Sequence, residues 1–253
     1  MQAHDAGRQS RRGFIGAAGA VAARLAILIM GGLPLAARAA DGAKLKIGII
    51  GSGRIGGTLG ELWLKAGHEV MFSSLDLEHD KALAARLGAG ARAGTPREAA
   101  AFGEVLLVSV PYSALPQLGR ELADSIRGKA VLDTSNPIPA RDGDMALEAR
   151  AKGTGVASAQ FLSGARLVRA FNSVGSASLR SEAHRAGERV AIPLAADDAP
   201  ALQIATRLVQ DAGFEPVVVG PLARAREFDA GSTPVYGKAL TARGLRKGLG
   251  LGS

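Results

Sequence analysis

The segment KIGIIGSGRIGGTLGELWLKAGHEVMFSS, residues 46–74, constrains the fold more than any other part of the chain. It consists of an apolar run of strand length, a glycine-rich turn, a segment of helical period and a second apolar run. Two strands that are joined through a helix form a βαβ unit, in which the strands are parallel. The turn, residues 51–56, matches G-x-G-x-x-G in the context where that pattern predicts a dinucleotide site.

The alternation of strand-length apolar runs with helical segments continues to the C-terminus. This pattern predicts a Rossmann-type α/β fold, with a doubly wound, mostly parallel sheet and a small C-terminal α/β extension. Residues 136–155 show no clear period, and we expect them to form a long loop. The expected strands are 45–50, 69–73, 104–110, 130–133, 166–170, 189–194 and 216–219.

Two expected helices carry local start signals. Thr95 precedes a proline and then Glu98, the pattern of a capping box. Asp198 is followed by Ala199-Pro200 and an apolar stripe, and Gly213 is expected to end that helix.

The first 39 residues resemble a bacterial twin-arginine export signal. The run SRRGFI at residues 10–15 precedes an apolar segment, and Ala37-Arg38-Ala39 supplies a small-x-small cleavage site. Residues 40–253 would then form the exported oxidoreductase domain in the periplasm, after passage through the twin-arginine machinery. A membrane anchor is disfavoured because Arg24 interrupts the apolar run, leaving less than the roughly 20 residues of a span. Translation from Met30 would instead give a cytoplasmic protein.

Composition excludes several classes of function. Five arginines against one aspartate in the first 39 residues supply half of the net charge of +8, and aromatic residues make up only 4% of the chain. We therefore expect no nucleic-acid binding. The chain has no cysteine and no clustered histidines, so neither a disulfide, a thiolate nucleophile nor a metal site is expected.

The glycine turn predicts how a dinucleotide is held. Gly51 allows the tight turn, Gly53 allows the backbone to approach a pyrophosphate, and Gly56 allows the helix to pack on its strand. The N-terminus of that helix attracts the anion. The residues expected at the pyrophosphate are Gly51, Ser52, Gly53, Arg54, Ile55 and Gly56, and those expected near the adenosine ribose are Ser73 and Ser74.

The end of the second strand leaves the choice of dinucleotide open. NAD-specific sites commonly place Asp or Glu there, whereas this chain has Ser73, Ser74 and Leu75. Serine hydroxyls donate to a 2′-phosphate only modestly without a basic neighbour, a role that Arg54 could take. Asp76 could instead turn back to a ribose hydroxyl and favour NAD.

Residues 46–76 resemble the family of NADPH-dependent F420 reductases and predicted dinucleotide-binding oxidoreductases, relatives of the N-terminal domain of pyrroline-5-carboxylate reductase. The resemblance continues through VLLVSVPYSAL, GKAVLDTSNPI, ARLVRAFNSVGSASL and DAGFEPVVVGPLARARE. It implies NADP(H) as cofactor, with a Ser-Arg pair on the 2′-phosphate. Ser74 matches the serine, but Leu75 replaces the arginine, so NADP(H) is expected only slightly ahead of NAD(H).

Further site residues are expected just after other strands, where open α/β sheets bind ligands. Val110 and Pro111 would wall the cofactor, and Asn136 and Asn172 could bond a nicotinamide amide or an acceptor carbonyl, unless they only cap turns. No catalytic acid–base set is evident. The histidines, Asp133 and Asp229 are interpreted as structural or surface groups, and the two tyrosines are Tyr112 and Tyr236.

The sequence thus predicts an NAD(P)-dependent oxidoreductase that moves a hydride between a nicotinamide cofactor and a small-molecule acceptor. Hydride transfer to a flavin-like acceptor mainly requires that the protein hold the nicotinamide ring face to face with the acceptor. An F420-like deazaflavin or a flavin could therefore be the co-substrate. The alternative is a protein that binds or senses a dinucleotide without turnover. Oligomers are common in the family, but no interface is evident in this chain.

Overall fold

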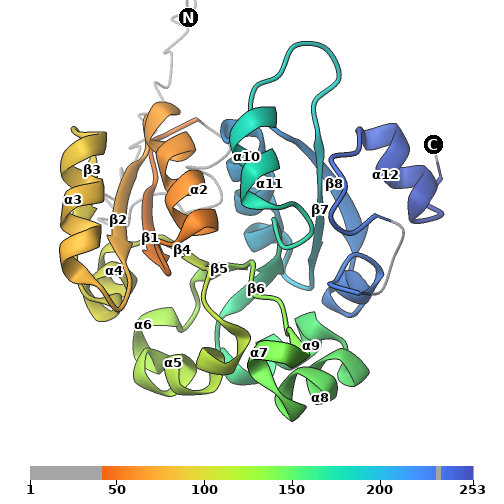
Figure 1. Ribbon diagram of the computed structural model, residues 1–253, viewed down its shortest axis with the longest axis horizontal. Coiled ribbons are helices and arrows are strands. Elements are labelled where there is room, and N and C mark those ends of the chain that lie inside the picture. Colours follow the sequence, from red (N-terminus) through yellow and green to blue (C-terminus); the bar gives the residue numbers. More distant parts are fainter. Residues whose placement is uncertain (1–41, 232–234, 253) are drawn as a thin grey trace, which may run out of the picture. The chain divides into compact units, whose positions relative to one another are not determined.

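The computed structural model describes residues 42–231 and 235–252, which form an eight-stranded sheet in the order β3-β2-β1-β4-β5-β6-β7-β8 (Figure 1). The expected export signal lies outside these residues. The first six strands have the order of a dinucleotide-binding Rossmann sheet, which confirms the predicted fold class. The strands are β1 (Lys46–Ile50), β2 (Glu69–Ser73), β3 (Ala91–Ala93), β4 (Val105–Val108), β5 (Ala130–Asp133), β6 (Arg166–Arg169), β7 (Ala191–Ala196) and β8 (Glu215–Gly220).

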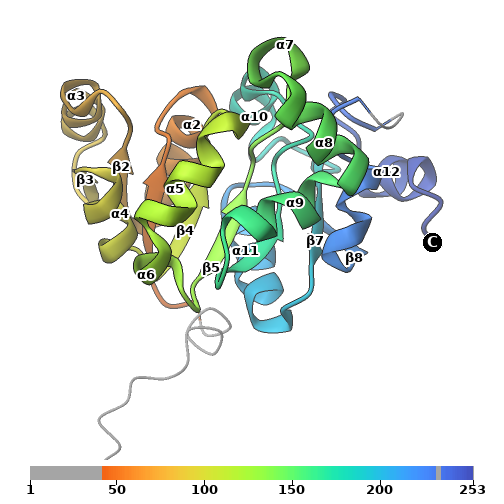
Figure 2. The same cartoon turned by 90° about the horizontal axis from the view of Figure 1, so that it is seen from below.

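Helices cover both faces of the sheet (Figures 1 and 2). One face carries α2 (Arg54–Lys65), α3 (Leu77–Leu87), α10 (Ser176–Glu182) and α11 (Ala199–Asp211). The other carries α4 (Pro96–Phe102), α5 (Leu115–Glu121), α6 (Ala123–Ile126), α8 (Asp144–Lys152) and α9 (Thr154–Phe161). Shorter elements are η1 (Tyr112–Ala114), α7 (Pro139–Asp142) and η2 (Leu222–Glu227), and α12 (Ala242–Gly248) packs beside β7 and β8.

The strands are buried on both faces, as their continuous apolar runs predict. Ile49 of β1 packs into the core beneath α2 and α11, whereas the next residue, Ile50, packs into the core beneath α5 and α9. Trp63 of α2 is fully buried, and its indole N–H donates to the carbonyl of Leu208 in α11 at 2.8 Å. This contact joins the glycine-turn helix to the C-terminal part of the sheet.

The C-terminal extension attaches in a way that the sequence analysis did not address. β7 pairs with β6 in the antiparallel sense, and β8 then pairs parallel to β7, so the extension continues the same sheet. The sequence analysis also missed β3, a three-residue edge strand with the sequence Ala-Arg-Ala and no apolar run. Antiparallel direction leaves no mark on composition when both faces are buried, which explains the first omission.

The prediction of a long loop over residues 136–155 was wrong. The segment forms α7, α8 and the start of α9. The reason is that α8 buries only Ala146 and Ala149, so its charged sequence shows almost no apolar stripe.

The predicted helix starts are confirmed. Thr95 and Glu98 form a complete capping box, and the Asp198 carboxylate accepts from the N–H of Ala201 at 2.7 Å. Gly213 has a φ of +89° just after α11. Within the described ranges, no helix is both long and apolar enough to cross a membrane.

Candidate dinucleotide-binding site

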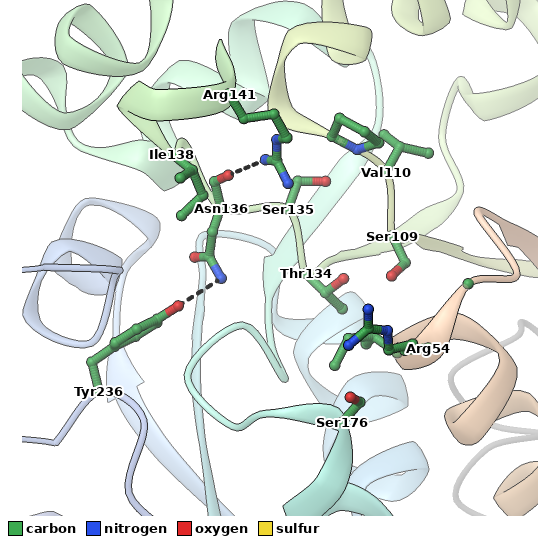
Figure 3. Close-up of a pocket in the computed structure, with 13 residues that line it drawn as sticks. Arg54, Ser109, Val110, Thr134, Ser135, Asn136, Ile138, Arg141, Ser176 and Tyr236 are labelled. Carbon is green, nitrogen blue, oxygen red and sulfur yellow. Dashed lines mark hydrogen bonds between the residues drawn. The ribbon is translucent and has the colours of Figure 1, made fainter. Parts of the chain in front are cut away.

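A groove of about 430 Å³ opens at the carboxyl ends of β1, β4 and β5 (Figure 3). The strand order reverses between β1 and β4, which is where Rossmann sheets bind their ligands. Its volume lies in the range of small-molecule sites. The residues that line it are Gly53, Arg54, Ile55, Ser109, Val110, Pro111, Thr134, Ser135, Asn136, Ile138, Arg141, Ser176 and Tyr236.

The three glycines of the turn have the separate roles that their positions predict. Gly51 has a φ of +99°, and a Cβ there would lie 2.2 Å from the carbonyl oxygen of Ser109. A Cβ on Gly56 would lie 2.0 Å from the carbonyl oxygen of Gly51, so the start of α2 needs a glycine to pack on the turn. A Cβ on Gly53 would meet nothing within 4 Å. Gly53 therefore leaves space open on the groove side of the turn.

The N-terminus of α2 has no protein cap. Its N-cap residue, Gly53, offers no side chain, and no acidic residue lies in its first turn. By contrast, α3, α4 and α11 are each capped by a side chain, from Asp76, Thr95 and Asp198 respectively. An uncapped helix start that opens into a groove is a ready-made anion site.

Two arginines add positive charge to the groove. The Arg54 guanidinium points toward Thr134, and Arg141 reaches over from α7, donating to the carbonyl of Asn136 at 2.8 Å (Figure 3). Because Arg141 is paired with Asp142 at 2.8 Å, the net positive charge that a pyrophosphate requires comes mainly from Arg54 and the helix start.

The far end of the groove joins a second cavity of about 280 Å³, lined in part by Asn172 and Ser173. The Asn136 amide donates to the carbonyl of Asn172 at 2.8 Å and to the Tyr236 hydroxyl at 3.4 Å (Figure 3). The Asn172 amide donates to Asp229 at 3.1 Å. The side-chain oxygens of both asparagines are buried and have no hydrogen-bond partner, so each presents a vacant acceptor.

A buried charge network underlies these asparagines. Arg169, at the end of β6, is fully buried and contacts both Asp133 and Asp229 at 2.8 Å. It also donates to the carbonyl of Ser135 at 2.8 Å. Burial alone would lower the pKa of Arg169, but the charges of Asp133 and Asp229 raise it. Asp133 and Asp229 are therefore not isolated carboxylates, and their network sets the orientation of Asn172.

Another carboxylate, that of Asp142, connects the two walls of the groove. Asp142 has a fully buried side chain and accepts from the N–H of Ile138 at 2.8 Å and of Ser113 at 3.2 Å. Burial would raise the pKa of its carboxyl, but hydrogen bonds from Arg141 and from these two N–H groups lower it to about 2. Asp142 thus ties the segment after β5 to the segment after β4.

The ribose end of the site differs from the prediction at Ser73. Its hydroxyl is fully buried and donates to the carbonyl of Ile49, in the neighbouring strand β1, at 2.7 Å. Ser73 contributes instead through its carbonyl, which accepts from the N–H groups of Gly51 and Ser52. The Ser74 hydroxyl points away from the core and donates to Asp80 at 2.8 Å.

Asp80 is a site residue that the sequence analysis missed. It lies in the first turn of α3, is fully buried, and accepts hydrogen bonds from Ser52 and Ser74. Asp76, which the sequence suggested as a ribose ligand, instead caps α3 through a bond from the N–H of His79 at 2.9 Å. A signal for Asp80 existed, since it lies on the apolar face of α3, one turn before Ala84.

Other expected groups lie away from the groove. Tyr112 is fully buried, and burial, opposed by a hydrogen bond with Ser158, raises the pKa of its hydroxyl to about 12. His68 lies at the opposite end of the sheet, between the N–H of Leu45 and the Asp211 carboxylate. In the described part of the chain, no group of three acidic or histidine side chains could hold a metal ion.

The structure brings most of the predicted site residues together. Gly53, Arg54, Ile55, Val110, Pro111 and Asn136 line the groove, Gly51 and Gly56 shape the turn beside it, and Ser52 and Ser74 meet at Asp80. Sequence reasoning missed Ser109, Thr134, Ile138, Arg141 and Ser176 as lining residues. Most of them lie in segments after β4 and β5 or at the start of α10, where no local motif marks them.

Comparisons with known proteins agree with this geometry. Residues 46–137 match the family described as NADP oxidoreductase, coenzyme F420-dependent, which confirms the resemblance over that segment. A hypothetical protein from Sinorhizobium meliloti superposes with a TM-score of 0.67 at 24% identity, covering 79% of this chain and 97% of that one. A protein from Arthrobacter sp. FB24, provisionally described as an F420-dependent NADP reductase, superposes with a TM-score of 0.59 at 19% identity, covering 72% and 87%. No curated protein sequence matched.

A third similar structure is an imine reductase from Myxococcus stipitatus in complex with NADP⁺. Its TM-score is 0.51 at 22% identity, and the match covers 72% of this chain and 57% of that one. At these identities the structural likeness establishes the fold. The chain has the fold of NAD(P)-dependent oxidoreductases.

Proposed function

We propose, from the family match of residues 46–137 and the geometry of the groove, that the chain is an NAD(P)-dependent oxidoreductase. It would transfer a hydride between a nicotinamide cofactor and a small-molecule acceptor. The observation that carries the proposal is the uncapped start of α2, which opens into the groove through Gly53. The start of α10, whose first residue Ser176 lines the same groove, also has no side-chain cap, so two helix starts favour a bound anion there.

The residues present fit a nicotinamide dinucleotide along most of the groove. The α2 N–H groups, Arg54 and Arg141 would hold the pyrophosphate. The vacant oxygens of Asn136 and Asn172 would accept from the carboxamide NH₂ of the nicotinamide, since a primary amide carries two donors. When bound, the nicotinamide ring supplies or takes the hydride, and the chain holds it in position.

The acceptor would occupy the second cavity, which shares Ile55, Thr134, Asn136 and Tyr236 with the groove. Among the described residues, neither cavity is lined by a histidine, a lysine or a carboxylate. A site without an acid–base pair suits an acceptor that takes a hydride directly, such as a flavin or a deazaflavin of the F420 type. The matching family, whose description names coenzyme F420, supports this class of acceptor.

The proposal is tested with one glycine substitution in the full chain. Gly53→Ala adds a methyl group that meets no protein atom, at a φ of −64° and a ψ of −159°, next to the extended region that alanine adopts. We expect normal thermal stability and at least a tenfold loss of cofactor affinity in a fluorescence titration. Gly244→Ala, in α12, is the matched control and should bind the cofactor normally.

Binding alone would not separate an enzyme from a dinucleotide-binding protein. The wild-type chain is therefore mixed with reduced cofactor and, in turn, with F420, FMN, FAD and a quinone, and cofactor oxidation is followed by absorbance. Oxidation with one of these acceptors supports the enzyme. Tight binding without oxidation under any of these conditions would favour a binding or sensing role.

We also propose that the chain is exported, on the basis of the arginine pair at Arg11 and Arg12. Cell fractionation should find the wild-type full chain in the periplasm. The substitution of both arginines by lysine should retain it in the cytoplasm, and an equal distribution of the two forms would refute a twin-arginine signal.

A further inference from the structure

Asp80 places a carboxylate at the corner of the site where the adenosine ribose of a dinucleotide would lie. It is fully buried on α3 and accepts from the hydroxyls of Ser52, in the glycine turn, and Ser74, after β2. Asp and Glu of NAD-specific sites commonly lie at the end of the second strand itself. Here the strand end carries serines, and the carboxylate reaches the same corner from the following helix.

The serine protons are already committed. A hydroxyl carries one proton, and both Ser52 and Ser74 donate theirs to Asp80. The Ser74 oxygen also accepts from the N–H of Asp76 at 3.1 Å. The two hydroxyls therefore offer no proton to a 2′-phosphate, whereas the remaining lone pair of Ser74 can accept from a free ribose hydroxyl.

Among the described residues, the cations nearest the corner line a cavity of about 330 Å³ beside Ser52 and Gly53, and two of them have contacts of their own. The His79 ring lies 3.4 Å from the Asp80 carboxylate. Leu75, in the place where the family pattern has an arginine, is fully exposed and contributes no charge. Arg54 points toward Thr134 on the groove side of the turn (Figure 3). Arg86 faces Glu61 at 3.9 Å, and Arg180 donates to Thr58 at 3.0 Å. A phosphate of charge about −1.5 to −2 at the corner would lie near the Asp80 carboxylate, and a nearby cation would have to leave its present contact to compensate for that repulsion.

We infer that Asp80 is the specificity-determining residue for the cofactor and that the chain selects NAD(H) over NADP(H). Asp80 acts as a positioning residue, because it directs the hydroxyls of Ser52 and Ser74 and does not itself reach the groove. The inference rests on the proposed function, and it departs from the NADP(H) preference that the family resemblance implies.

The test is a pair of titrations, with NADH and with NADPH, on the full-length wild type and three variants. The wild type should bind NADH at least tenfold more tightly than NADPH. Asp80→Asn keeps the size of the side chain but removes its charge, and it should reduce this ratio at least tenfold, chiefly by strengthening NADPH binding. Adding Leu75→Arg to Asp80→Asn should shift the ratio further toward NADPH.

Asp76→Asn is the matched control. It also removes one negative charge beside the ribose corner, and asparagine caps a helix as well as aspartate. It should leave the ratio within about twofold, since Asp76 does not receive the serine protons. Thermal unfolding of each variant shows whether it is folded.

The two hypotheses fail in different ways. If neither cofactor binds the wild type, the proposed function fails and the selectivity with it. If both bind, and the wild type prefers NADPH or Asp80→Asn leaves the ratio unchanged, the oxidoreductase proposal survives and the role of Asp80 is refuted. A ratio that responds to Asp76→Asn and not to Asp80→Asn would assign the selectivity to Asp76 and refute the role of Asp80.

Discussion

The two ends of the groove are built by different means. Around the glycine turn the site is made of backbone: a turn with positive φ, an uncapped helix start and a glycine that leaves space open. Around Asn136 and Asn172 it is made of side chains, held by the buried charges of Arg169, Asp133 and Asp229. The shape of the first end depends on backbone conformation, and the shape of the second end depends on buried ion pairs.

The largest expected effect comes from the buried network. Arg169→Met leaves Asp133 and Asp229 buried without their cation, and we expect a loss of about 3–5 kcal/mol in the free energy of unfolding. Arg166→Met, on the same strand, is the control, because Arg166 is partly exposed, donates to the Gly128 carbonyl at 2.6 Å and faces Asp198 at 4.0 Å. Urea unfolding should show a loss below about 1 kcal/mol for that variant. Equal losses would mean that the far end does not depend on buried pairing.

The glycine turn should fail through conformation. Gly51→Ala forces a side chain into a φ of +99° and against the Ser109 carbonyl, so we expect a loss of about 2–3 kcal/mol. Gly53→Ala, two residues away, should leave the free energy of unfolding unchanged. Urea titration of the two variants side by side measures the difference. If both were equally stable, the strain assigned to Gly51 would be wrong.

Between the two walls of the groove, Asp142 should make the stability of the chain depend on acid. The pKa of Asp142 is lowered from 3.8 to about 2 in the folded chain, so its contribution of about 2 kcal/mol is present above pH 4 and is lost as the pH falls toward 2. Asp142→Asn should lose about that amount at pH 7 and show a weaker dependence on pH between 4 and 2. Urea midpoints of the wild type and the variant across this range provide the measurement. Parallel curves for the two proteins would contradict the assignment.

The smallest effect is expected at Tyr236. Its hydroxyl accepts from the Asn136 amide at 3.4 Å, a long bond at the edge of the groove. Tyr236→Phe should change cofactor affinity by less than about threefold, because the Asn136 amide keeps its bond to the Asn172 carbonyl. A larger loss in a titration would show that the hydroxyl contacts the cofactor directly.

The same comparison explains how much could be predicted from the sequence. The glycine turn occupies six consecutive residues, and its roles follow from local geometry, so the turn, its helix and most of the parallel sheet were predicted correctly. The charge network draws on residues from β5, β6 and the segment after η2, which only the tertiary fold brings together. No spacing in the sequence links Asp133 to Arg169 or Asp229.

Asp80 could be predicted from the sequence only in part. Its position on the apolar face of α3 could be read from the sequence, but its bonds to Ser52 and Ser74 depend on how α3 packs against the glycine turn. The prediction that placed Ser73 near the ribose did not account for one contact of its side chain. The Ser73 hydroxyl is buried against β1, where it donates to the Ile49 carbonyl, and the position of the strand end alone does not reveal that contact.

The most direct test of the central claim, hydride transfer in this groove, follows the hydrogen itself. The full chain is incubated without oxygen with a reduced nicotinamide cofactor that carries deuterium at C4 of the ring, and with F420 as acceptor. A deazaflavin takes the hydride on carbon, so the label is retained and is detected by mass spectrometry. The account predicts deuterium on the acceptor for the wild type and at least a tenfold slower transfer for Gly53→Ala. Bound cofactor with no label on F420 or on any other acceptor that holds the hydride on carbon would contradict it.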